Sequence, residues 1–458
     1  MTNKGKKKYQ KAASEKVKDM DYPWVVVEKG LCVRCGACVD LCPKSLLRLD
    51  GYYYPWIDDI HDRCNLCGLC KVPCPGAEMN LPAFSLSLFD DDNSDQKILG
   101  IYKYPLIGYS VNESVRNLGS AGGMVTQILL TLLSSGIIEA ALVAGMSGEE
   151  PWKGEPVLAC SRDQIMACSQ SKYTVVPQMK YLGEIVRSRK NIAIVGLPCH
   201  IHAFRKFQAK YPEKVSNVKL VIGLFCHMAI EIEGTEKMLE CAEIKKKDLD
   251  RIEYRGGKWP GKVRAVLKNG ETKPLHHADF KDGAINYLKY LYYPKRCMTC
   301  LDFSAELSDL SVGDPWFRNR DGSYVYRGGH SLILVRTKRA EKLLNMVVNR
   351  GSAVIEPINK SLLRPRFIGM YKHKKIGAQI RIRALKNKGC HYPNYHTDEP
   401  HSKLSDKITE GLSEMMRILG KSEKGRNLGS LLAFSSFGKV LNTVRKARKE
   451  FIARFQYR

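Results

Sequence analysis

Apolar runs and amphipathic segments alternate through the middle of the chain. Four runs have the length of buried strands, at residues 141–144, 192–195, 220–224 and 332–335. Residues 178–189 have helical spacing instead, because one face carries Met179, Leu182, Ile185 and Val186. This alternation predicts an α/β domain over residues 105–356, with a mainly parallel or mixed sheet and helices on its faces.

The longest apolar stretch, residues 128–146, is predicted to be a buried helix, a turn and a strand. It contains Glu139, and Ser134, Ser135 and Gly136 interrupt it midway. A membrane span needs about twenty apolar residues without charge, so this stretch does not qualify. With 458 residues, 44% of them hydrophobic, the chain is long and apolar enough for two or three soluble domains.

The two ends of the chain have a different pattern. Residues 1–21 are polar and basic and are expected to form a flexible arm. Residues 83–104 are expected to be a linker. Residues 357–458 are expected to form a basic, partly helical C-terminal extension, in which residues 376–395 show no clear apolar period.

Two segments of this extension, residues 404–420 and 429–455, are predicted to be amphipathic helices. In the second, a basic group opposes an apolar face made of Leu431, Leu432, Phe434, Phe437, Val440, Leu441 and Val444. We first expect this helix to pack on its own domain. The alternative is peripheral contact with the inner face of a membrane, because a basic amphipathic helix can lie in an anionic interface.

The net charge of +27 is large and unevenly distributed. From residue 361 onward there are 22 Lys and Arg against 7 Asp and Glu. Such a surface attracts acidic partners, such as an acidic ferredoxin or redox subunit, a polyanionic coenzyme or anionic lipid. Nucleic acid ranks last among the partners, because the chain contains no recognisable nucleic-acid-binding module.

Sixteen cysteines and no apparent signal peptide indicate metal ligation in the reducing cytoplasm. Eight of them form two copies of one motif, C-x2-C-x2-C-x3-C-P, at residues 32–43 and 64–75. This is the bacterial ferredoxin pattern for [4Fe–4S] clusters, whereas structural zinc uses separate C-x2-C pairs. Residues 22–82 are therefore predicted to be a two-cluster ferredoxin domain.

The two motifs are expected to exchange their last cysteines, because in two-cluster ferredoxins the fourth Cys ligates the other cluster. The first predicted ligand set is Cys32, Cys35, Cys38 and Cys74. The second predicted set is Cys64, Cys67, Cys70 and Cys42. Gly36 and Gly68 allow the backbone to close around the inorganic sulfides.

Four further cysteines can form a third set. Cys199 and Cys226 each follow a predicted strand, and Cys297 and Cys300 form a C-x2-C pair. In open α/β sheets ligands gather beyond the carboxyl ends of strands. On spacing alone, a third [4Fe–4S] cluster and a zinc ion explain these four thiols equally well. The cysteines that match no set, and that we expect to be ordinary small side chains, are Cys160, Cys168, Cys241 and Cys390.

A glycine-rich segment, residues 119–123, opens a predicted helix. Small residues at a helix start let a phosphate approach the free N–H groups at the positive end of the helix dipole. A tight turn packed on the sheet explains the same residues without a ligand.

Over about residues 105–350 the chain resembles the coenzyme F420 hydrogenase/dehydrogenase beta-subunit family. The motifs that carry the resemblance follow the family's order: SAGGMVT (120–126), SKY (171–173), GLPC (196–199), IGLFC (222–226), YRGGKWPG (254–261), CMTC (297–300) and SVGDPW (311–316). The ferredoxin motifs precede them, as in some dehydrogenase members. Ala121 departs from the usual Gly, and the extension beyond residue 360 has no recognised counterpart.

The family binds FAD and carries a [4Fe–4S] cluster close to the flavin. The resemblance thus implies that the third cysteine set holds a cluster rather than zinc. It also implies that FAD is bound by Ser120, Ala121, Gly122, Gly123, Met124, Ser171, Lys172, Tyr173 and Lys258. Lys172 and Lys258 are the candidates for a catalytic role, since their charge suits a phosphate or a reduced flavin; simple surface solvation is the alternative. His200 and His227 are expected to be structural.

The resemblance implies a flavin-dependent iron–sulfur oxidoreductase. In the family's namesake, a hydride passes between C5 of the deazaflavin F420 and N5 of FAD. Single electrons would then pass through the third cluster to the two ferredoxin clusters and on to a partner. One alternative is a ferredoxin-dependent flavoprotein reductase of another organic substrate, like chlorophyll reductase or a polysaccharide-pathway member. The other is a non-enzymatic electron-wire subunit of a larger complex, without flavin.

Overall fold

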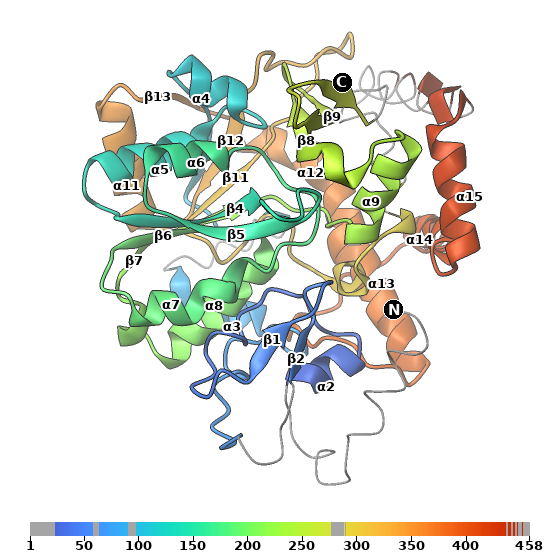
Figure 1. Cartoon of the computed structure of the whole chain (residues 1–458), viewed down its shortest axis with the longest axis horizontal. Helices are drawn as coiled ribbons and strands as arrows, with labels where there is room; N and C mark the ends of the chain where they lie inside the picture. The colour runs from blue at the N-terminus through green and yellow to red at the C-terminus, as the bar shows by residue number, and fades with distance from the viewer. Residues whose placement is uncertain are drawn as a thin grey trace.

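The computed structural model of this chain describes residues 23–57, 64–89, 98–275 and 290–436, together with residues 288, 438–440, 443, 444, 447 and 451. The basic arm expected at residues 1–21 lies outside this described part. A large mixed sheet forms the centre of the molecule, the cysteine-rich N-terminal module lies against one side of it, and the C-terminal helices run past both (Figure 1).

The central sheet has eight strands in the order β13-β3-β12-β11-β7-β6-β4-β5. Its four central strands, β11, β7, β6 and β4, are parallel, whereas the outer strands pair antiparallel. The strands are β3 (Tyr104–Ser110), β4 (Ala140–Met146), β5 (Gly154–Ala159), β6 (Ile192–Gly196), β7 (Val218–Leu224), β11 (Leu310–Gly313), β12 (Ser331–Val335) and β13 (Ala353–Pro357). The expected mixed α/β architecture is therefore confirmed.

Helices cover both faces of the sheet (Figure 1). On one face Ala141 and Val143 pack against helices α5 (Met124–Ser134), α6 (Arg162–Ala167) and α11 (Lys338–Asn349), beside the short α4 (Glu113–Leu118). On the other face Ala140 and Leu142 pack against η3 (Gln178–Tyr181), α7 (Leu182–Arg187) and α8 (Pro198–Lys210), with η4 (Glu213–Val215) after them. Burial on both faces explains why these strands are uninterrupted apolar runs in the sequence.

A second, three-stranded sheet lies beside the first. It consists of β8 (Leu249–Gly256), β9 (Lys262–Leu267) and β10 (Thr272–Pro274), all antiparallel, and packs on α9 (Ile232–Cys241), with η5 (Lys246–Asp248) leading into β8. Its core includes Leu249, Ile252, Met238 and Leu239.

The N-terminal module is built from helix α2 (Pro23–Glu28), the hairpin of β1 (Leu47–Leu49) and β2 (Pro55–Ile57), and the cysteine loops. It packs directly on the large domain, because Ala37 and Met79 belong to the same buried cluster as Phe204 of α8. Gly36, with a φ of +80°, is required here: a side chain would come within 3.0 Å of the Pro177 carbonyl.

The segment expected as a linker, residues 83–104, contains most of helix α3 (Leu81–Leu88). Asn80 starts this helix by accepting a hydrogen bond from the Ala83 N–H at 3.0 Å. Residues 90–97 lie outside the described part, and β3 begins at Tyr104.

The C-terminal extension is helical from its start. After η7 (Lys360–Leu362), helix α12 (Leu363–Tyr371) continues through one π-helical turn, η8 (Lys372–Ile376), into α13 (Gly377–Asn387). Two further helices follow, α14 (Leu404–Leu419) and α15 (Glu423–Phe434). The structure confirms the predicted helix at 404–420, whereas the one expected at 429–455 begins earlier, at Glu423, and much of it lies outside the described residues. The helix at 128–134, the turn and the strand at 140–146 are confirmed.

Asp309, at the start of β11, ties the two faces of the sheet together. Its backbone and carboxylate pair with Val221 of β7, and the carboxylate also receives Arg205 of α8 at 3.2 Å and Arg339 of α11 at 2.7 Å. Burial raises the pKa of Asp309, but the two guanidinium groups outweigh burial and hold this pKa below its ordinary value. The carboxylate is therefore a charged, fully paired group inside the fold.

We predict that Asp309→Asn lowers the free energy of unfolding by about 3 kcal/mol, because two buried arginines lose their anion. Anaerobic urea unfolding, followed by circular dichroism, measures this change. The matched control is Asp163→Asn at the exposed start of α6, where we expect a change within about 0.5 kcal/mol. Because the folded pKa of Asp309 is depressed, its contribution persists at neutral pH and is lost only as the pH falls below about 4. Equal stability of the two variants would contradict this role.

Candidate functional site

The first two cysteine sets each line one cavity in the N-terminal module. One cavity is lined by Cys32, Cys35, Cys38 and Cys74, together with Gly36, Val33 and Pro75. The other is lined by Cys42, Cys64, Cys67 and Cys70, together with Gly68 and Leu66. The fourth cysteine of each motif lies with the three of the other motif. The structure thus brings together the two predicted sets, called site I and site II below.

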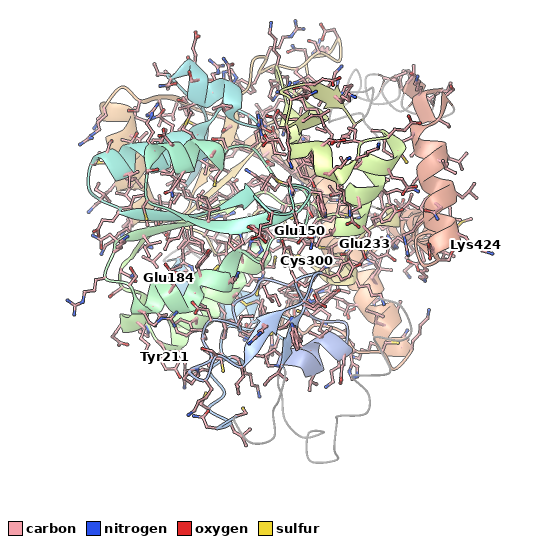
Figure 2. The ribbon with its side chains drawn as sticks, in the orientation of Figure 1. Glu150, Glu184, Tyr211, Glu233, Cys300 and Lys424 are labelled. Carbon is pink, nitrogen blue, oxygen red and sulfur yellow. The ribbon has the colours of Figure 1, made fainter. Side chains whose placement is uncertain are left out.

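The third set comes together from three separate segments. Cys199 lies in the first turn of α8, Cys226 directly follows β7, and Cys297 and Cys300 flank the end of η6 (Lys295–Thr299). Burial, and then the thiols of Cys226, Cys297 and Cys300, raise the pKa of Cys199 well above its ordinary value. We call this group site III; Figure 2 shows Cys300 in the middle of the molecule, where the N-terminal module meets the sheet domain.

The three sites lie in a row. The Cys35 thiol of site I acts on the pKa of Cys199 in site III, and the Cys70 thiol of site II acts on the pKa of Cys38 in site I. Site I therefore lies between the other two. Site II is at the surface, where Cys67 is exposed.

Buried polar contacts hold the segments of site III. The Asp302 carboxylate, two residues after Cys300, meets Nε2 of His202 on α8 at 3.0 Å, and both side chains are buried. This pair joins the helix that carries Cys199 to the loop that carries Cys300. The Asp302 carboxylate also accepts hydrogen bonds from the backbone N–H groups of Ser304 and Glu306.

Three cations surround sites I and III. Arg34 is buried between them and pairs with Glu231 at 2.7 Å. Arg296, also buried, donates to the Pro75 and Gly76 carbonyls next to Cys74 and to the Tyr395 hydroxyl. Burial lowers the pKa of Lys374, but the thiolates of Cys300, Cys226 and Cys297 outweigh burial and raise this pKa. The sequence did not single out these cations, because a buried cation leaves no periodic signal.

The chemistry of the three sites favours a multi-atom cluster. Burial raises the thiol pKa to about 12 at Cys32, Cys70 and Cys226, so these groups bind as thiolates only when a positively charged metal centre displaces their protons. Within the described residues, no three Cys, His, Asp or Glu side chains converge closely enough to hold a single metal ion. A single zinc ion needs four ligands at about 2.0–2.3 Å, whereas a cubane spreads its thiolates around a larger body.

A second candidate region surrounds the glycine-rich segment 119–123, which the structure places at the start of α5. Gly123 has a φ of +72°, and a side chain at Gly122 would come within 2.5 Å of the Gly108 carbonyl. The Ser120 hydroxyl accepts a hydrogen bond from the Ser171 N–H at 2.7 Å. The two segments predicted to hold the flavin are therefore in contact.

Lys172 shapes this region from behind. Its ammonium donates to the carbonyls of Cys168 and Ser169, both at 2.7 Å, and of Gln170 at 3.2 Å, at the carboxyl end of α6. All three ammonium protons are thus committed to the backbone. Burial lowers the pKa of Lys172 to about 8, opposed by the Cys168 thiolate. Its charge is spent on the helix end.

The motif around Lys258 approaches the glycine-rich segment through Trp259. Lys258 itself is exposed, in the turn between β8 and β9. The Trp259 ring stacks on Trp316 at 5.3 Å, and a side chain at Gly329 would lie 2.4 Å from the Ala121 carbonyl and 3.5 Å from Trp259. Lys258 and residues 120–124 therefore belong to one neighbourhood.

Two buried polar atoms in this neighbourhood fit a bound group. Within the described residues, Trp259 Nε1 and His330 Nδ1 are buried and have no hydrogen-bond partner. Orphaned polar atoms of this kind are uncommon in folded proteins and call for a partner. Their place beside a glycine-rich helix start suits a planar, phosphate-bearing cofactor.

Sequence reasoning did not assign a role to the ion pair of Arg255 and Asp314. Arg255 is buried and bidentate, with distances of 2.9 and 3.1 Å to the two carboxylate oxygens, and its Nε donates to the Pro260 carbonyl. The Arg255 charge also acts on the pKa of the neighbouring Tyr173. Both residues lie in motifs that carry the resemblance, which was the available signal.

The remaining candidates behave as ordinary structural groups. His200 is buried, its Nδ1 accepts from the Leu197 N–H at 3.1 Å, and burial lowers its pKa to about 3, so it is a neutral structural group. His227 contacts His373 at 3.1 Å. The four cysteines outside the predicted sets line neither site I nor site II: Cys160 and Cys390 are exposed, Cys168 and Cys241 partly buried. In the described part of the chain, no helix is both long and apolar enough to cross a membrane.

Two models of one family, the coenzyme F420 hydrogenase/dehydrogenase beta subunit, match the chain. The model of the N-terminal part of that subunit matches residues 106–183. The model of its C-terminal part matches residues 189–361. The two together cover more than half of the chain, including site III and the glycine-rich segment.

Individual proteins are similar over comparable regions. The beta subunit of the coenzyme F420 hydrogenase of Methanothermobacter thermautotrophicus is 29% identical over 290 residues, 61% of this chain and 91% of that protein. The F-type subunit of the F(420)H(2) dehydrogenase of Methanosarcina mazei is 30% identical over 54% of this chain and 64% of that protein. The coenzyme F420-dependent sulfite reductase of Methanocaldococcus jannaschii is 26% identical over 74% of this chain, which spans only 50% of that protein.

A solved structure shares the fold. One chain of the F420-reducing [NiFe] hydrogenase complex from Methanosarcina barkeri superposes with a TM-score of 0.51 and 23% identity, covering 67% of this chain and 98% of that chain. The fold and the matched families define a redox-enzyme component. The chain belongs to the coenzyme F420 hydrogenase/dehydrogenase beta-subunit family, as the sequence motifs indicated.

We predict that Lys172→Met loosens the loop that joins α6 to residues 171–173. Each lost hydrogen bond from a charged donor is worth about 1.5–3 kcal/mol, so amide hydrogen exchange over residues 168–171 should accelerate at least about tenfold. Exchange detected by mass spectrometry measures this. Lys180→Met, which removes an exposed charge on η3, is the control and should leave the loop unchanged. Unchanged exchange in both variants would show that Lys172 does not hold this loop.

Proposed function

We propose that the chain is a flavin-dependent iron–sulfur oxidoreductase that passes electrons between coenzyme F420 and one-electron [4Fe–4S] carriers. The observation that carries this proposal is the row of three cysteine sites, which begins in the family-matched domain and ends at the surface of the N-terminal module. Three thiolate sets in series have no use in hydride transfer alone, but they suit a path for single electrons.

In this proposal residues 120–124 and 171–173 hold FAD, with Lys258 in the same neighbourhood. FAD, when bound, supplies the exchange between two-electron and one-electron chemistry. The Ser120–Ser171 hydrogen bond fixes the two segments against each other. Lys172 holds its loop in place through the carbonyls at the end of α6, and Arg255 with Asp314 orients the strand that leads to Trp259.

The twelve cysteines hold three [4Fe–4S] clusters, at sites III, I and II in that order from the flavin. Site II is the exit or entry point for an external partner, because Leu66 and Cys67 are exposed there. The exposed Lys44 and Lys71 border the same site and favour an acidic partner, such as a ferredoxin or an acidic redox subunit. Arg34 and Arg296 offset the negative charge of the two buried sites.

We predict that the anaerobically purified chain contains bound flavin and that reduced coenzyme F420 bleaches the flavin and iron–sulfur absorbance together. The same titration on Cys226→Ser, which removes one thiolate of site III, should bleach the flavin but leave sites I and II oxidised. Absorbance spectroscopy under exclusion of oxygen measures both.

Two other results would each select another function. Bleaching by reduced ferredoxin, with no response to reduced F420, would favour a reductase of another organic substrate. Bound iron without flavin would contradict an enzymatic role and favour an electron-wire subunit.

We also propose that helices α14 and α15 dock on an anionic membrane surface. Four apolar residues along one side of α14 are exposed by more than half: Leu404, Ile408, Leu412 and Met415. Leu428 and Leu431 of α15 are equally exposed, and the sequence from residue 403 onward carries 13 Lys and Arg against 5 Asp and Glu. Exposed apolar residues flanked by basic charge are the chemistry of an interfacial helix.

The prediction is that Leu412→Ser with Met415→Ser abolishes co-sedimentation with vesicles that contain phosphatidylserine. Leu86→Ser, equally exposed on α3, is the control and should sediment like the unmodified chain. Neutral phosphatidylcholine vesicles should bind all three proteins weakly. Equal sedimentation of the double variant and the unmodified chain with anionic vesicles would rule out this docking surface.

A further inference from the structure

The part of the extension between residues 362 and 397 lies beyond both family models, yet it packs against the cysteine sites. Helix α13 lies beside the N-terminal module in Figure 1, and Ala378 and Ile382 belong to the same buried cluster as Cys35 and Met79. The extension is therefore part of the core around sites I and III.

Lys374, in the π-helical turn η8, reaches site III itself. Its side chain is 1% exposed, and its ammonium lies 3.5 Å from the Cys297 carbonyl oxygen. The thiols of Cys300, Cys226 and Cys297 are the groups whose charge acts on it most strongly. Within the described residues, no carboxylate lies at ion-pair distance from this ammonium. A buried cation needs a compensating anion, and the anionic groups that face it are the thiolates of site III.

Neighbouring contacts fix the turn that carries Lys374. Arg381, about two helical turns further along the chain, donates to the Met298 carbonyl at 2.6 Å and to the His373 carbonyl at 2.9 Å. The Arg381 guanidinium also pairs with Glu410 of α14 at 2.5 Å. The loop between Cys297 and Cys300 and the turn of Lys374 are thus held by one guanidinium.

The segment after α13 continues over the N-terminal module. The Met79 N–H donates to the Asn394 carbonyl and the Asn394 N–H to the Ala77 carbonyl, both at 2.8 Å. The Tyr395 hydroxyl accepts from Arg296, which in turn reaches the Gly76 carbonyl beside site I. The extension therefore joins sites I and III from outside both family-matched regions.

We propose that the C-terminal extension completes site III by placing the Lys374 ammonium against its thiolates, and thereby raises the reduction potential of the cluster held there. This inference rests on the proposed function, since it requires a cluster at site III. Reduction adds one negative charge to the cluster. A fixed positive charge in a buried, weakly screened place stabilises the reduced form more than the oxidised form.

The test is a redox titration of the anaerobically purified full chain, monitored by electron paramagnetic resonance, for the unmodified protein and for Lys374→Met. Methionine keeps the length and apolar stem of the side chain and removes its charge. The signal of site III is identified as the one that Cys226→Ser removes. We expect Lys374→Met to make one-electron reduction of that cluster at least tenfold less favourable, a shift of about 59 mV to lower potential, with sites I and II unchanged.

Three comparisons make the result decisive. Lys372→Met removes an exposed, solvent-screened charge from the same turn and should leave all three potentials unchanged. Lys374→Gln serves as a second neutral variant if Lys374→Met does not assemble. Full iron content with an unshifted site III potential in the neutral variant overturns the inference. An unmodified chain in which Cys226→Ser removes no signal overturns the proposed function instead, because site III then holds no cluster.

Discussion

The structure depends on the compensation of negative charge buried between its parts. Sites I and III bring eight thiolate groups into an interior where an uncompensated charge is costly. Arg34, Arg296 and Lys374 enter that interior from three different regions of the chain: the N-terminal module, the loop of site III and the C-terminal extension. Each cation also makes backbone or ion-pair contacts that join its region to another. Electrostatic compensation and the assembly of the parts are therefore the same set of contacts.

These contacts explain why the N-terminal module is a fixed part of the molecule. Gly36 lies so close to Pro177 that only glycine fits, and Met179 donates to the Cys35 carbonyl at 2.8 Å. Site I is thereby held against the start of α8, where Cys199 of site III lies. A short and constant separation between neighbouring sites is what a path for electrons requires, and in this structure it follows from backbone contacts.

The sequence predicted most of what local patterns encode. The cysteine spacing specified the sets of sites I and II, and the apolar runs located β4, β6, β7 and β12. The segment 376–395 was not recognised as helical, because buried charges such as Arg381 replace the apolar residues that would mark its inner face. The positions of Lys172 and Lys374 could not be predicted either. Whether a lysine faces solvent, a helix end or a cysteine site depends on tertiary contacts that spacing does not encode.

The most direct test of the account is the metal content of the anaerobically purified chain, by elemental analysis alongside protein quantification. Three clusters require about twelve iron atoms per chain and no stoichiometric zinc. About eight iron atoms with one zinc would mean that Cys199, Cys226, Cys297 and Cys300 hold a single structural ion, and the row of three redox centres would be contradicted.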